Sequence, residues 1–266
     1  MFVLTQQKII LYSFNGEFIK EFTISKYNTR FDAIQYLNNH IYLFENIKMG
    51  YSIYNWLVLD TTGNQISFNL NNIPKFNSRQ IPLNDITFKH GNLLFYWNQF
   101  NDTIYQIMNK NHSAAFLFSK GNFRITPTNR DNDYIYYNEC FRPSKIIKTN
   151  NFFIIKYAYR KNWGLAVLNS NNKFVTYELN NSVTDIGIIN DIDGGYPFDP
   201  QQYMVKNQNE FLISWTDAYK LKTYLKSEAF QSSTPKYPEK KKELERLANS
   251  LDENDNPVLM LVKLKN

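Results

Sequence analysis

The sequence predicts an all-β fold, a β-propeller of four-stranded antiparallel blades. One pattern, a strand, a tight polar turn and a second strand, occurs four times, at residues 12–24, 57–70, 105–118 and 165–179. With Gly16, Gly63, Asn111 and Asn171 as turn markers, the copies are 47, 48 and 60 residues apart. A blade of four strands repeats every 40 to 50 residues or so, and one longer loop explains the last interval.

Two further strands are predicted before each of the later turns, which completes four strands per blade. The pairs are 31–37 with 40–44, 86–89 with 92–97, 144–149 with 152–158, and 202–205 with 210–215. They meet at Asn38-Asn39, His90-Gly91, Asn150-Asn151 and near Asn207. Aromatic and β-branched runs broken by Asn or Gly about every ten residues are typical of all-β folds. Residues 2–11 are predicted as one strand, so the chain opens on a partial blade.

One helix and a closing strand are predicted at the end. Pro238 suits the first turn of a helix, and an apolar stripe follows at i, i+3, i+4 and i+7. The stripe is Leu244, Leu247, Ala248 and Leu251. Residues 257–264 then form a dense apolar run, which is typical of a buried strand.

Composition favours a single domain. The chain has 266 residues, 43% of them hydrophobic, which is enough for one sizeable core, and all-β folds often run this long as one unit. We expect one propeller over residues 1–266, with blade units at 1–24 (partial), 25–70, 71–118, 119–180 and 181–266. The 21 Phe and 19 Tyr residues suit strands, whose pleated faces accommodate wide rings.

Four segments resemble a bacterial family of six-bladed β-propeller proteins. They are NDTIYQI (101–107), NDIDGGYPFDP (190–200), WTDAYKLK (215–222) and NPVLMLVKLK (256–265). The resemblance implies a protein outside the cytoplasm, in the periplasm or at the cell surface, with a lipoprotein-type signal peptide and no settled activity. It also implies that this chain carries about five of six blades and is shortened at its N-terminus. The first ten residues lack the basic start and small-residue cleavage site of a signal peptide.

Charge and cysteine content argue against several functions. The net charge is +6, but the densest basic run, Lys240 to Lys242, lies among glutamates, as on a solvated helix face, so we expect no nucleic-acid partner. Cys140 is the single cysteine, so no internal disulfide forms. No Cys/His cluster has the spacing of a metal site, and we predict neither metal nor cofactor.

Two pairs of carboxylates are candidates for metal binding or catalysis. Asp191 and Asp193 precede Gly194-Gly195 and resemble the opening of a calcium loop, but the other acidic ligands are absent, which favours a structural turn. In that turn we expect both glycines to take backbone angles barred to other residues. Asp32 and Asp85 begin two predicted inner strands, where glycoside hydrolysis would need facing carboxylates.

The remaining candidates are aromatic and polar residues in loops predicted to open on one face of the propeller. They are Lys48, Tyr51, Asn98, Phe100, Arg160, Trp163, Tyr196, Asp217 and Tyr219. Flat rings beside planar polar groups suit sugar rings or partner side chains. We therefore expect a non-enzymatic binding or interaction module of the cell envelope, with a glycan or another envelope protein as partner. A carbohydrate-active hydrolase or lyase on the same scaffold is the alternative, and a structural component of a surface assembly is the third.

Overall fold

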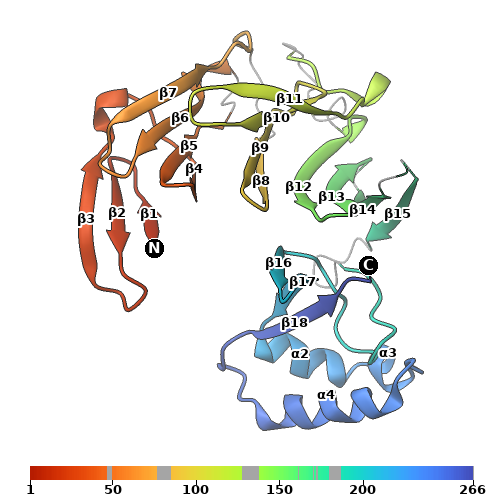
Figure 1. The fold of residues 1–266 in the computed structure, drawn as a ribbon. Coiled ribbons are helices and arrows are strands. Elements are labelled where there is room, and N and C mark those ends of the chain that lie inside the picture. Colours follow the sequence, from red (N-terminus) through yellow and green to blue (C-terminus); the bar gives the residue numbers. More distant parts are fainter. Residues whose placement is uncertain are drawn as a thin grey trace. The chain divides into compact units, whose positions relative to one another are not determined.

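The described part of the chain forms five antiparallel sheets in a computed structural model (Figure 1). Their strand orders are β1-β2-β3, β4-β5-β6-β7, β11-β10-β9-β8, β12-β13-β14-β15 and β16-β17-β18. The structure describes residues 1–46, 50–76, 85–127, 138–160, 162–169, 171, 173–179 and 187–265. The predicted all-β propeller with antiparallel blades is confirmed, and five blades are present among these residues.

The strands of the first three sheets are β1 (Phe2–Leu4), β2 (Lys8–Tyr12), β3 (Phe18–Thr23), β4 (Ala33–Leu37), β5 (His40–Phe44), β6 (Tyr54–Asp60), β7 (Gln65–Leu70), β8 (Ile86–His90), β9 (Leu93–Trp97), β10 (Thr103–Ile107) and β11 (His112–Leu117). Those of the last two are β12 (Arg142–Lys148), β13 (Phe152–Tyr159), β14 (Asn162–Asn169), β15 (Phe174–Leu179), β16 (Gln202–Lys206), β17 (Asn209–Thr216) and β18 (Val258–Lys263). The helices are α2 (Ala218–Leu225), α3 (Glu228–Gln231) and α4 (Pro238–Ser250), with 3-10 turns η1 (Ser25–Tyr27) and η3 (Gly121–Phe123).

The predicted turns have the backbone that two-residue hairpins require. Asn38 and Asn39 have φ of 48° and 61°, and Leu37 pairs with His40 across the turn. Positive φ at both central positions matches the twist of the flanking strands, and Asn tolerates it better than most residues. Gly16 and Gly63, which mark two of the repeats, have φ of 85° and 87°.

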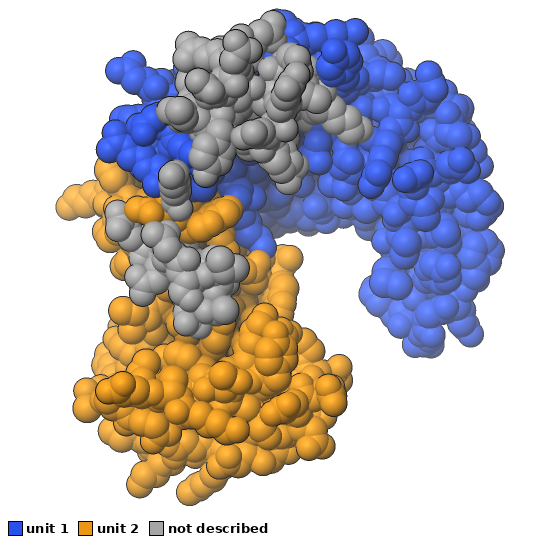
Figure 2. All heavy atoms as spheres, turned by 180° about the vertical axis from the view of Figure 1, so that it is seen from behind, with its two compact units in different colours: residues 1–146, 158–160 blue, residues 147–157, 161–266 orange. Residues whose placement is uncertain are grey.

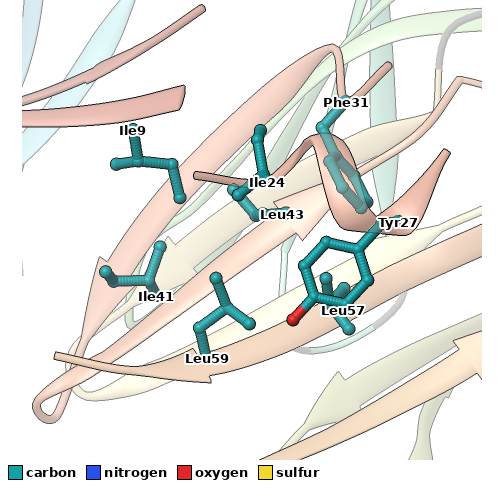
Figure 3. Packing of buried hydrophobic residues seen from close by; sticks show 8 residues of the cluster. All are labelled: Ile9, Ile24, Tyr27, Phe31, Ile41, Leu43, Leu57 and Leu59. Atoms are coloured by element: carbon teal, nitrogen blue, oxygen red, sulfur yellow. The ribbon is translucent and has the colours of Figure 1, made fainter. Parts of the chain in front are cut away.

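The core consists of apolar layers between neighbouring sheets. One layer joins the first sheet to the second through Ile9, Ile24, Tyr27, Phe31, Ile41, Leu43, Leu57 and Leu59 (Figure 3). The next layer joins the second sheet to the third and includes Tyr42, Phe44, Trp56, Val58, Leu94, Tyr96 and Ile107. Successive residues of a strand point to opposite faces, so β5 and β6 supply both layers and are buried on both sides. Many of the aromatic residues thus fill space between blades, as expected.

The chain divides into two compact units, coloured separately in Figure 2. Unit 1 comprises residues 1–146 and 158–160, and unit 2 comprises residues 147–157 and 161–266. Unit 2 has its own layer around Ile154, Leu165, Phe198 and Leu212. A second cluster joins α2, α3 and α4 through Leu221, Leu225, Phe230 and Ala248. None of the described helices has the length and apolarity needed to cross a membrane.

Three local predictions need correction. Residues 2–11 form two strands, β1 and β2, because the Thr5 hydroxyl bonds the backbone N–H and C=O of Lys8 and closes a turn. α4 begins at Pro238 as predicted, but α2 and α3 were not expected. Of the glycine pair, only Gly194 has a positive φ, of 71°. At Gly195 a side chain is disfavoured for a different reason, because a Cβ there would lie 2.5 Å from Leu244 Cδ2.

Candidate functional site

Unit 2 contains an apolar pocket with a volume of about 580 Å³. Phe152 and Ile154 of β13 and Leu165 and Val167 of β14 line one side. Leu212 of β17 and residues of β18 also contribute, since Leu212 pairs with Val262 and Ser214 with Met260. The i, i+2 spacing of these side chains places them on one face of each sheet. The volume lies within the roughly 300 to 1,000 Å³ of small-molecule sites, which are also mostly apolar.

A hydroxyl group of a pocket-lining residue has no hydrogen-bond partner among the described residues. Thr216, the last residue of β17, is 4% exposed and lines the pocket. Its Oγ1 is buried and makes no hydrogen bond within the described part of the chain. An unsatisfied buried hydroxyl costs about 1–3 kcal/mol. Because this oxygen has almost no accessible surface, a ligand in the pocket reaches it only if the wall rearranges.

The turn at residues 190–195 forms another part of the wall. Asp191 O and Ile192 O accept the backbone N–H groups of Lys236 and Tyr237 at 2.7 and 3.1 Å. Asp193 Oδ1 accepts the Gly195 N–H at 2.8 Å, as expected of a structural turn. Among the residues that the structure describes, no group of three or more His, Cys, Asp or Glu side chains could hold a metal ion.

The structure brings three predicted site residues together at the start of α2. Lys220 Nζ lies 2.8 Å from Asp217 Oδ2 and 5.6 Å above the ring of Tyr219. The hydrogen bond that Lys220 donates to Asp217 raises the pKa of Lys220, and Tyr196 also interacts with this ammonium group. The ring of Tyr196 packs on Tyr224 at 5.4 Å and lines the apolar pocket. This aromatic and charged group thus adjoins the pocket through Tyr196.

Three other predicted residues lie in unit 1. Asn98 is buried, and its Oδ1 accepts the backbone N–H of Phe100 at 2.9 Å. Phe100 is partly buried and packs edge-to-face on Phe76 of a core cluster, with the ring centres 5.4 Å apart. Tyr51 is 61% exposed, with Lys75 Nζ 5.1 Å from its ring centre. Asn98 and Phe100 are therefore parts of the packed interior, while Tyr51 is available at the surface.

Two further predicted residues, Arg160 and Trp163, lie on other elements. Arg160, at φ 47°, pairs with Glu139 at 3.0 Å and lies over the ring of Tyr159. Trp163 is 39% exposed on β14. Lys48 lies outside the described residues.

Asp85, which the sequence predicted at the start of an inner strand, lies in unit 1. The protonation state of its carboxyl group could not be predicted from the sequence. Asp85 precedes β8, and its Oδ2 bonds the Tyr96 hydroxyl, which also contacts Asn55 Oδ1 at 3.2 Å. Its Oδ1 is buried without a partner in the described part of the chain. Burial raises the pKa of Asp85 to about 8, against the hydrogen bond from Tyr96, and the charge of Asp32 raises it further. Asp85 is therefore neutral at pH 7, and can itself donate to Tyr96 Oη while Tyr96 donates to Asn55.

Asp32 remains an acceptor in a different environment. Its Oδ2 accepts the Asn46 N–H at 2.9 Å, and its Oδ1 lies 3.8 Å from Arg30 Nε. The two aspartates precede β4 and β8, matching positions in two blades, and the charge of Asp32 raises the pKa of Asp85.

Comparisons with known proteins place the chain in a family. A candidate exported protein from Bacteroides fragilis has a similar fold, with a TM-score of 0.62 and 14% sequence identity, over 100% of this chain and 77% of that one. No curated protein matches. The profile of a domain of unknown function, DUF4934, matches residues 1–263. Because this match spans nearly the whole sequence, the chain belongs to the DUF4934 family.

Proposed function

We propose that this protein is a non-enzymatic binding module of the cell envelope whose ligand enters the apolar pocket of unit 2. The observation that carries the proposal is a cavity of about 580 Å³ bordered almost entirely by apolar side chains. Small-molecule sites are clefts of this size lined mostly by apolar side chains. A ligand with an apolar body would remove this apolar surface from water, which stabilises the complex.

Two further observations support a location in the cell envelope. The structural neighbour from Bacteroides fragilis is described as a candidate exported protein. The resemblance of residues 190–200, 215–222 and 256–265 to an extracytoplasmic propeller family indicates the same compartment. A sixth blade and a lipid anchor remain part of this proposal.

The proposal is tested with an uncharged fluorescent probe, Nile red, whose emission rises in apolar surroundings. We expect saturable binding to the whole chain. The Val167→Phe variant adds volume to the pocket wall and should weaken binding at least tenfold, because overpacking removes the space that the probe needs.

The matched control is Val205→Phe on β16, where the valine is 57% exposed and lies outside the pocket wall. This variant should bind the probe as the wild type does. Circular dichroism must show that both variants are folded. If Nile red does not bind, or if the two variants bind it equally, the pocket is not the ligand site.

The alternative, a carbohydrate-active hydrolase or lyase, is favoured by the raised pKa of Asp85, to which the charge of Asp32 contributes. Such enzymes use a pair of carboxyl groups, one of which has a raised pKa and acts as the general acid. We expect no release of reducing ends or unsaturated products from a panel of polysaccharides. If the wild type cleaves a polysaccharide and the Asp85→Asn and Asp32→Asn variants both do not, the protein is an enzyme and the binding proposal is wrong.

A further inference from the structure

The last strand of unit 2, β18, has one open edge. It pairs with β17 in antiparallel register, and no other described strand pairs with it. The Leu264 N–H donates to Glu210 O at 2.9 Å, so every second residue back along β18 also bonds β17. The residues between them, Leu259, Leu261 and Lys263, therefore turn their N–H and C=O groups to the open edge. Within the described ranges these groups have no hydrogen-bond partner.

This edge lacks the features that protect other outer strands from pairing. Leu259 and Leu261 are 65% and 54% exposed, and no charged residue lies between Val258 and Val262. The outer strands of the first three sheets, β3, β7 and β11, each have a register shift against their neighbour, which bends an edge away from further pairing. The register of β18 with β17 has no shift. An unprotected edge of this kind accepts another extended strand.

The charges at the two ends of β18 favour one orientation of the added strand. The turn before β18 holds the exposed acidic residues Asp252, Glu253 and Asp255. Lys263 and Lys265, at the other end of the strand, are exposed basic residues. A second β18 in antiparallel orientation brings the basic end of each strand to the acidic end of the other, whereas a parallel one brings like charges together. The strand is thus complementary in charge to an antiparallel copy of itself.

We propose that β18 pairs with β18 of a second copy of this chain, in antiparallel orientation about a twofold axis. The register centred on Leu261 pairs all three residues of the open edge, Leu259 with Lys263 and Leu261 with its own counterpart. The two sheets then form one continuous sheet, and Leu261 packs on the same leucine of the second copy. Such an isologous contact is the usual kind in homodimers.

Sedimentation equilibrium of the whole chain over a concentration series tests the pairing. The readout is mass rather than probe binding, because Leu261 also borders the apolar pocket. We expect a monomer–dimer equilibrium that weakens at high salt, since the paired ends carry opposite charges. Leu261→Lys and Leu261→Glu each place like charges across the axis, and each should weaken dimerisation about tenfold. A mixture of the two variants should restore the dimer, because opposite charges then face each other.

Leu117→Lys is the matched control, because Leu117 is 77% exposed on β11, an outer strand with a register shift. This variant should dimerise as the wild type does. Hydrogen exchange resolved by residue gives a second readout. The amides of Leu259, Leu261 and Lys263 should become protected as the concentration rises, whereas the amide of Met260, which bonds β17, should be protected at every concentration.

Three results would overturn this inference. A chain that stays monomeric at every concentration does not pair through β18. A dimer that survives in Leu261→Lys, or that the mixture of charged variants does not restore, is held by another contact. Protection of the three open-edge amides in the monomer means that a segment of the same chain covers the edge. None of these results depends on Nile red, so the proposed function is tested separately.

Discussion

Replacing Asp85 by asparagine should stabilise this protein at neutral pH. A carboxyl group whose pKa is about 8 in the folded chain, against an ordinary value of 3.8, keeps its proton on folding while the unfolded chain releases it. The folded state then binds more protons than the unfolded state between these values. The contribution of Asp85 to the stability must therefore fall as the pH rises from about 4 to about 8.

The size of the effect follows from the two pKa values. At pH 7 the unfolded carboxyl group is 3.2 units above its pKa of 3.8, and each unit is worth about 1.4 kcal/mol. The cost of Asp85 at pH 7 is thus at most about 4 kcal/mol, and close to zero at pH 4. The amide is neutral at every pH and similar in shape, and it can still bond Tyr96. Asp85→Asn should remove most of this cost at pH 7 and change little at pH 4.

The assay is urea unfolding of the wild type and the variant at several pH values between 4 and 8, with hydrogen exchange of β8 and β9 peptides as a local measure. Asp60→Asn is the control with the opposite sign. Hydrogen bonds from Thr62 and Asn64 lower the pKa of Asp60 to about 2, so its carboxylate stabilises the fold above pH 4. The Asp60→Asn variant should be less stable than the wild type, and this loss should be about the same at every pH from 4 to 8.

Two results would refute this reasoning. A stability difference between Asp85→Asn and the wild type that does not grow from pH 4 to pH 8 would mean that Asp85 is ionised in the folded chain. An Asp85→Asn variant that is less stable at pH 7 would mean that the carboxylate makes a favourable interaction that burial does not outweigh.

Two further predictions concern Thr216 and Gly50. Thr216→Val should stabilise the ligand-free protein by about 1 kcal/mol in thermal unfolding, because it removes an unsatisfied hydroxyl. Thr149→Val should destabilise the protein, because the buried Thr149 hydroxyl accepts the Phe152 N–H at 2.9 Å. Gly50→Ala should cost more than 2 kcal/mol, since a Cβ would lie 2.5 Å from Pro74 O at a φ of 78°; Gly16→Ala, at a similar φ with open space around it, should cost about 1 kcal/mol. Equal losses at the two glycines would contradict the steric argument.

The strand pattern was predictable because its turns are encoded locally. Asn38, Asn39, Gly63 and Gly91 all have positive φ, and these are residue types that tolerate it. The turn between β1 and β2 was missed because it depends on the side chain of Thr5 rather than on Gly or Asn. Short helices such as α2 carry too few residues for their periodicity to stand out.

The candidate site was predictable only in part. Asp217 and Tyr219 meet at Lys220, their neighbour in sequence, whereas Tyr196 joins them from an earlier loop. The apolar pocket was not foreseen, because its wall combines β13 and β14 with a turn and two strands up to about 100 residues later. The neutral state of Asp85 also depends on burial, which a sequence does not specify for one carboxyl group.

The layered core has a consequence for how sequences of this kind can change. Each apolar layer is shared by two adjacent sheets only, as the layer around Ile41 and Leu43 and the layer around Tyr42 and Phe44 illustrate. Duplicating or deleting one whole repeat leaves every other interior intact, since the new neighbours present faces of the same kind. Gene-level gain or loss of a repeat is therefore far less disruptive here than in a fold with one central interior.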